Sequence, residues 1–223
     1  MTDPDAVQPG LFDEPAHRLP HPSTRVVLLC GPSGSGKTSL TRRLGLPVLA
    51  LDDFYRDVDD DRPQAPLPRR FGIVDWDDPR SWDADAAMDC LLDLCAGRRA
   101  QVPVYDISLS RRTGVTHLEV DGSPLLLAEG IFAAQLVDRC RQAGILADAV
   151  CLDQRPALTF WRRLARDLAE SRKPPWTLLR RGLALMRDEP RLVAHWASLG
   201  CRRLSPPAAE AHIHALRAQA SAA

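Results

Sequence analysis

Short apolar runs alternate with longer amphipathic segments along most of the chain. The runs have the length of buried strands and occupy 26–30, 46–51, 101–106, 125–128 and 147–152. Segments with apolar residues at helical spacing follow them, and the helices that this spacing predicts begin after 38 and cover 81–96, 131–143, 156–170, 175–187 and 208–219. Strands that alternate with helices are typical of a mostly parallel sheet covered by helices, so the pattern predicts an α/β fold.

Capping residues and turns add detail to this pattern. Ser81 is expected to N-cap the helix that stops at Gly97. Residues 117–120 and the Asp121-Gly122 pair after them are expected to form a hairpin strand and its turn. Residues 1–23 carry five prolines and few apolar side chains, which predicts a flexible leader before a single domain over 24–223.

The glycine-rich sequence GPSGSGKT, residues 31–38, stands between the first strand and its helix. This strand–GxxxxGKT–helix order is that of a phosphate-binding P-loop. Its glycines let backbone N–H groups approach phosphate oxygens, and the helix N-terminus adds the positive end of its dipole. Lys37 is expected to contact the β and γ phosphates of a nucleotide, and the Thr38 hydroxyl to bind the accompanying Mg²⁺. The residues predicted to bind the nucleotide are Gly31, Ser33, Gly34, Ser35, Gly36, Lys37, Thr38 and Ser39.

Two carboxylates follow apolar strands. Asp52 comes directly after 46–51, and Glu129 directly after 125–128. Because ligands bind outside the carboxyl ends of parallel strands, both carboxylates are expected near the phosphate site. Asp52 can accept a proton from a substrate hydroxyl or hold Mg²⁺, and Glu129 is a second candidate for Mg²⁺ or its waters. A solvated acidic loop is the alternative, and it is preferred for the aspartates between 57 and 61.

Arginines gather on the helix expected at 156–170. Arg163 and Arg166 share it, and a proline break at 171–175 with Arg172 and Lys173 follows. A mobile segment with arginines beside a P-loop can neutralise the charge that develops in phosphoryl transfer and exclude water. A solvated helix face is the alternative interpretation.

Composition narrows the class of protein. The chain has 223 residues, 45% hydrophobic content and a formal net charge of zero, which suits one core and gives no bulk electrostatic reason for a nucleic-acid or membrane partner. The acidic, proline-containing N-terminus is unlike a signal peptide, and no apolar run is long enough for a membrane span, so a cytoplasmic location is expected. The six cysteines lack CxxC spacing and are expected to be buried thiols rather than a zinc site.

Six segments resemble one family in their order and approximate spacing: GPSGSGKT, LDDFY, DWDDPRSWD, VPVYD, LLLAEG and RRLARD. Together they are similar to uridine kinases, within the group that also holds phosphoribulokinase and pantothenate kinase. The resemblance covers about 24 to 187. It implies a three-layer P-loop fold with a small lid and a substrate lobe. It also implies transfer of the γ-phosphoryl of ATP, with Mg²⁺, to a primary hydroxyl, with the 5′-hydroxyl of uridine or cytidine first. A homo-oligomer is left open.

The resemblance also implies roles for individual residues. It makes Asp52 the base on the substrate hydroxyl, Asp77 a ligand of ribose hydroxyls and Tyr105 a contact of the nucleobase. Glu129 would lie near Mg²⁺, and Arg163 and Arg166 would be lid arginines. Tyr55 and Arg112 complete the predicted substrate site.

Some residues of the chain differ from the family pattern, and the differences affect the expected phosphoryl acceptor more than the expected reaction. Ser110 stands about where the family has a histidine that reads the pyrimidine edge, and Asp78 replaces the histidine of Phe-Asp-His-Pro. Another nucleoside, a sugar or a pantothenate-like alcohol is therefore the alternative acceptor, and a non-catalytic ATP-binding regulator is a further alternative. The chain has no asparagine, which excludes the Asn-Lys-x-Asp motif of switch GTPases, and it has no Leu-Ser-Gly-Gly signature of ABC ATPases.

Overall fold

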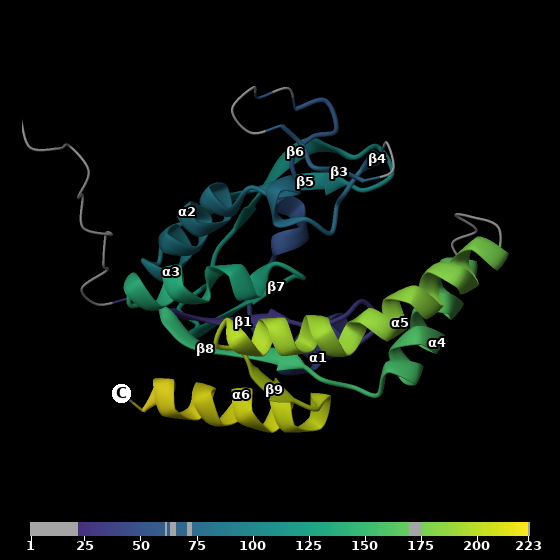
Figure 1. Cartoon of the computed structure of the whole chain (residues 1–223). Coiled ribbons are helices and arrows are strands. Elements are labelled where there is room, and N and C mark those ends of the chain that lie inside the picture. Colours follow the sequence, from purple (N-terminus) through teal and green to yellow (C-terminus); the bar gives the residue numbers. More distant parts are fainter. Residues whose placement is uncertain (1–21, 61, 63–65, 71–72, 170–174, 223) are drawn as a thin grey trace, which may run out of the picture.

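A parallel sheet of five strands forms the centre of the protein in our computed structural model, which describes residues 22–60, 62, 66–70, 73–169 and 175–222 (Figure 1). The strand order is β2-β7-β1-β8-β9. The bounds are β1 Arg25–Cys30, β2 Val48–Ala50, β7 Leu125–Glu129, β8 Leu146–Leu152 and β9 Arg202–Leu204. All four pairings are parallel, and β1 lies between β7 and β8.

Alternate residues of the central strands face two separate cores. In β1, Val26 and Leu28 pack with the helices α2 (Ala84–Cys95), α3 (Val137–Gln142) and the end of α5 (Pro175–Ser198), whereas Val27 and Leu29 pack against α1 (Lys37–Leu44) and α6 (Pro206–Ser221). The sheet is therefore buried on both faces, which explains why its strands read as continuous apolar runs. The predicted three-layer α/β fold is confirmed.

A smaller lobe lies to one side of the sheet (Figure 1). It consists of the antiparallel hairpin β5 (Ala100–Asp106) and β6 (Arg111–Leu118) and the short pair β3 (Arg69–Arg70) and β4 (Ile73–Val74). The 3₁₀ helix η1 (Leu51–Phe54) connects β2 to this lobe. Two further 3₁₀ helices, η2 (Pro79–Ser81) and η3 (Ala133–Leu136), precede α2 and α3.

Helices α4 (Pro156–Ala169) and α5 lie side by side and extend beyond the sheet (Figure 1). A buried polar pair ties them near the sheet, where the Thr159 hydroxyl donates a hydrogen bond to the Glu189 carboxylate at 2.7 Å. None of the helices in the described ranges is both long and apolar enough to cross a membrane. The predicted leader lies mostly outside the described residues, as do Arg172 and Lys173.

Ser81 is not a helix N-cap. The helix begins at Ala84, and Asp83 caps it by accepting a hydrogen bond from the Ala86 N–H at 3.1 Å. Ser81 instead closes η2, where its hydroxyl donates to the Asp78 carbonyl at 2.7 Å. The prediction failed because Asp78-Pro79 starts a short helical turn of its own, which delays the longer helix.

The hairpin turn was also placed wrongly. It lies at 107–110, where Asp106 accepts hydrogen bonds from the N–H groups of Ser108 and Leu109, and Asp121-Gly122 leads into β7 instead. Strand β6 is exposed along nearly its whole length, so no burial alternation marked it. The helix predicted at 131–143 is η3 followed by the shorter α3, and α5 continues to Ser198. The short strand β9 was not predicted.

All six cysteines are buried free thiols. Cys30, the last residue of β1, lies with its Sγ 3.7 Å from the Sγ of Cys201. The prediction of buried thiols is confirmed.

Replacing Thr159 by valine should lower the free energy of unfolding by about 1–3 kcal/mol, because it removes a hydrogen-bond donor from a buried carboxylate. Denaturant unfolding would measure this loss. Thr116→Val, on the exposed strand β6, is the matched control and should change stability little. An equal effect of the two substitutions would contradict the role given to the α4–α5 pair.

Candidate active site

The loop between β1 and α1 has the backbone geometry that its glycines permit. Gly34 and Gly36 have φ angles of 87° and 96°, in the left-handed region that favours glycine. A Cβ at Gly31 would lie 3.1 Å from the Leu152 Cβ and 2.9 Å from the Ser35 Oγ. The loop is therefore pressed against the end of β8, with its N–H groups at the start of α1, as a phosphate-binding loop requires.

Lys37 folds back over this loop. Its Nζ donates hydrogen bonds to the carbonyls of Gly31 at 2.7 Å and Pro32 at 3.3 Å. Burial lowers the pKa of Lys37, while the charges of Asp52 and Glu129 act to raise it. Part of the residue's surface stays open to solvent, but the ammonium lies against protein oxygens and within electrostatic reach of both carboxylates.

The two predicted carboxylates lie on neighbouring elements. Ala50 at the end of β2 pairs with Glu129 at the end of β7, and Asp52 follows in η1. Asp52 keeps exposed surface, yet the protein atoms around it reduce its hydration and raise its pKa, against the effects of Lys37 and of the Ile131 N–H. Burial also raises the pKa of Glu129, which Lys37 lowers and Asp52 raises further. The structure thus brings Lys37, Asp52 and Glu129 together.

Gly130 permits this close approach. A Cβ at this position would lie 2.8 Å from the Leu51 Cβ and 3.1 Å from the Asp52 Oδ1. The absence of a side chain therefore lets η1 lie directly against the end of β7. On the other side, the indole Nε1–H of Trp82, which lies between η2 and α2, donates to the Leu51 carbonyl at 2.7 Å and holds η1 in place.

Tyr55 lies at the centre of an aromatic cluster. Its ring centroid is 5.7 Å from those of Trp76 and Tyr105, and its hydroxyl donates to the Trp76 carbonyl at 3.2 Å. Burial raises the pKa of Tyr55, and the charges of Asp52 and Asp77 raise it further. The predicted substrate residues Tyr55, Asp77 and Tyr105 are therefore gathered beside Asp52.

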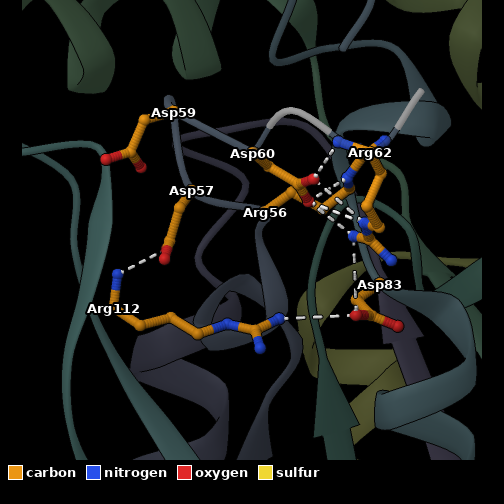
Figure 2. A pocket seen from close by; sticks show the side chains of 7 residues that line it. All are labelled: Arg56, Asp57, Asp59, Asp60, Arg62, Asp83 and Arg112. Atoms are coloured by element: carbon orange, nitrogen blue, oxygen red, sulfur yellow. Dashed lines mark hydrogen bonds and ion pairs between the residues drawn. The ribbon is translucent and has the colours of Figure 1, made fainter. Parts of the chain in front are cut away.

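Tyr105 connects this cluster to the hairpin and to η1. Its N–H donates to the Asp53 carboxylate at 3.4 Å, and its hydroxyl donates to the Arg56 carbonyl at 3.3 Å. Burial raises the pKa of Tyr105 to about 12, with a further rise from Asp57 and opposing effects of Arg112 and Ser110. Next to it is a cavity of about 340 Å³ lined by charged residues (Figure 2): Arg56, Asp57, Asp59, Asp60, Arg62, Asp83 and Arg112.

Comparison with known proteins identifies the family of the chain. The family model described as Phosphoribulokinase / Uridine kinase family matches residues 26–173. The chain belongs to this family. The uridine kinase of Schizosaccharomyces pombe is 32% identical over an alignment of 161 residues, and this alignment covers 69% of this chain and 34% of that protein. This chain thus spans about a third of the length of that relative.

Two further comparisons extend the likeness. The uridine kinase of Staphylococcus aureus strain JH9 is 26% identical over 172 residues, or 74% of this chain and 79% of that protein. A solved structure from Silicibacter sp. TM1040, provisionally assigned as a fructose transport system kinase, has a TM-score of 0.59 at 20% identity and covers 85% of this chain and 90% of that chain. At this identity the structural likeness shows the fold alone.

For some residues predicted for this phosphoribulokinase/uridine kinase site, the role stays a prediction. Arg163 and Arg166 lie on α4, but their side chains lie outside the described part of the structure. The Ser39 hydroxyl accepts a hydrogen bond from Arg43 on the exposed side of α1, so its contact with a nucleotide stays a prediction. Thr38 is exposed at the start of α1. Asp53, Trp76 and Asp83 were not predicted as site residues, because their contacts with Tyr105, Tyr55 and Arg112 join parts of the chain that are distant in sequence.

Gly130→Ala should displace η1 and with it Asp52. We expect a loss of about 1–3 kcal/mol in the free energy of unfolding, as for overpacked sites, and a larger proportional loss of any turnover that depends on Asp52. Thermal denaturation measures the first effect and a turnover assay the second. Gly114→Ala is the control, because nothing lies within 4 Å of the added Cβ. A Gly130→Ala protein indistinguishable from this control would contradict the close contact.

Proposed function

We propose that the chain is an ATP-dependent kinase that transfers the γ-phosphoryl group to a primary hydroxyl of a small molecule, with the 5′-hydroxyl of uridine or cytidine as the first candidate. The observation that carries the proposal is the gathering of Lys37, Asp52 and Glu129 beside a glycine-rich loop at the carboxyl edge of the sheet. Family membership and the uridine kinase relatives support it.

The loop and its lysine suit the nucleotide. The backbone N–H groups at the start of α1 and the Lys37 ammonium would hold the phosphates, and Lys37 would exchange its bonds to the loop carbonyls for bonds to phosphate oxygens. The Thr38 hydroxyl and the Glu129 carboxylate are oxygen donors of the kind that Mg²⁺ prefers. When bound, Mg²⁺ would neutralise charge on the transferred phosphoryl group.

Asp52 and the aromatic cluster suit the acceptor. The Asp52 carboxylate would accept the proton of the attacking hydroxyl, and its raised pKa makes it a better base than an ordinary aspartate. Asp77 would bind acceptor hydroxyls, and Tyr105 would lie against a flat ring. The protein would thus act mainly by positioning the two reactants and stabilising charge.

A different alcohol acceptor is the second candidate. Ser110, in the hairpin turn beside Tyr105, offers a hydroxyl where the family resemblance expects a histidine. A sugar or a pantothenate-like alcohol would need no base-edge contact at this position. A cytoplasmic location and a homo-oligomeric state are further proposals.

Wild-type protein with Mg-ATP should release ADP in a coupled assay when uridine or cytidine is added. Asp52→Asn should lower kcat by about 10²–10⁴-fold, the usual contribution of a positioned base, while ATP still binds. Asp89→Asn, an exposed change on α2, is the matched control. Other nucleosides, pantothenate and simple sugars complete the panel.

Each result of this panel decides between the candidates. Turnover with an alcohol other than a nucleoside would keep the kinase and discard the nucleoside acceptor. Nucleoside turnover that survives Asp52→Asn would remove the role given to Asp52. ATP binding without turnover on any acceptor would favour a regulator over an enzyme.

The pH dependence of kcat/KM should show the raised pKa of Asp52. The reaction needs the carboxylate form, so activity should fall as the pH drops through that pKa, at a pH above the value of about 3.9 for a free aspartate. Circular dichroism at each pH would verify that the protein remains folded. An acid limb at or below the ordinary aspartate value would contradict the assignment.

A further inference from the structure

The charged cavity lies next to Tyr105 of the proposed acceptor site. Arg112 on β6 pairs directly with Tyr105 on β5, so both side chains project from the same face of the hairpin. The charge of Arg112 also affects the pKa of Tyr105, which places the guanidinium near the ring. A flat group that lies against Tyr105 would therefore have its far edge in this cavity.

On one side of the cavity, the charged groups already have hydrogen-bond partners within the protein. Arg56 donates to Asp60 at 2.8 Å and to the Arg80 carbonyl at 3.0 Å, and Arg62 donates to the same Asp60 carboxylate at 2.9 Å. These contacts hold the Asp60 pKa well below its usual range. This group builds the wall of the cavity and has little capacity left for a ligand.

The other side keeps unused hydrogen-bonding capacity. The guanidinium of Arg112 makes no hydrogen bond to any residue within the described ranges, and its one ion pair, from Nη2 to the Asp83 Oδ2, is long at 3.5 Å. The Asp83 Oδ1 caps α2, whereas Oδ2 contacts, among the residues that the structure describes, only Arg112 and, at 3.9 Å, Arg62. Figure 2 shows the Arg112 side chain extended along the cavity toward Asp83.

The charge of the cavity disfavours an anionic ligand. Its lining holds three arginines and four aspartates, so it carries one more acid than base. An added phosphate or carboxylate would be repelled by the aspartates or would have to break existing ion pairs. A neutral ligand with one hydrogen-bond acceptor and one donor side by side can bind the unused groups without breaking the satisfied wall.

We infer that Arg112 and Asp83 read an amide-type edge of the acceptor, with the guanidinium donating to a C=O and the carboxylate accepting from the adjacent N–H. The uracil ring carries this edge. The pair would thus supply the base recognition that Ser110 alone does not. It would favour a nucleoside over a sugar that presents the same reacting hydroxyl but has no base. The inference rests on the proposed kinase function and names the substrate feature that its site recognises.

The test compares Arg112→Met with Arg111→Met. Arg111 is the next residue and pairs with Asp59 at 2.9 Å on the outer part of the loop, so it controls for loss of one exposed arginine. The acceptors are uridine, 3-methyluridine, which lacks the N–H, and methyl β-D-riboside, which lacks the base. Arg112→Met should raise the KM for uridine by about 10–100-fold, the range for a lost bond to a charged group, and leave the riboside KM unchanged.

Wild-type protein tests the inference without any variant. It should prefer uridine to 3-methyluridine by at least about 10-fold in kcat/KM, and this preference should shrink in Arg112→Met. Equal losses for uridine and the riboside would indicate a structural role and overturn the inference, as would equal effects of Arg112→Met and Arg111→Met. Absence of discrimination against 3-methyluridine would also overturn it.

Failure of the kinase proposal can be told apart from failure of this inference. If no acceptor is turned over, calorimetric binding of uridine in the presence of ADP replaces the kinetic readout. Uridine binding that weakens in Arg112→Met but not in Arg111→Met would support the recognition of the base while the kinase proposal fails. No uridine binding would overturn the inference.

Discussion

The ammonium group of Lys37 lies within electrostatic reach of the Asp52 and Glu129 carboxylates, and the arrangement of the carboxyl edge depends on this interaction. Desolvation raises the pKa values of Asp52 and Glu129 and lowers that of Lys37, so each group alone would tend to lose its charge. Their mutual attraction opposes this tendency. Two carboxylates against one ammonium leave negative charge at the edge, which suits a metal ion and a nucleotide that arrive together.

The segment η1 carries Asp52 and connects it to the rest of the site. It leans on Gly130 at the end of β7, receives a hydrogen bond from the Trp82 indole, and through Asp53 holds the backbone of Tyr105. The sheet, the helix α2 and the hairpin β5–β6 thus meet at four residues of 3₁₀ helix. A short helix held by contacts from three directions can position the Asp52 carboxylate more rigidly than a free loop could.

The structure could be predicted from the sequence where a strand is buried on both faces or where the residues of a motif are consecutive. Strands β1 and β7 could be predicted because both faces are apolar, and the phosphate-binding loop because its residues are consecutive. Prediction failed where the sequence pattern is weak or local turns compete. The exposed strand β6 shows no alternation of apolar and polar residues, and the helical turn that starts at Asp78-Pro79 delays the start of α2 past Ser81. Asp52 could be predicted from its place after an apolar strand and Tyr105 from the resemblance, but the pairing of Arg112 with Asp83 required the three-dimensional structure.

The buried cysteines can serve as probes of local and global unfolding. Burial raises the pKa values of Cys90, Cys95 and Cys140 to about 12, so the reactive thiolate is scarce at neutral pH, and all six cysteines are buried. Reaction with a soluble thiol reagent therefore needs a local or global unfolding event. Because Cys30 adjoins the phosphate-binding loop, whereas Cys90 and Cys95 lie on α2 and Cys140 lies on α3, the rate of labelling at each position would time the opening of a different element of the fold.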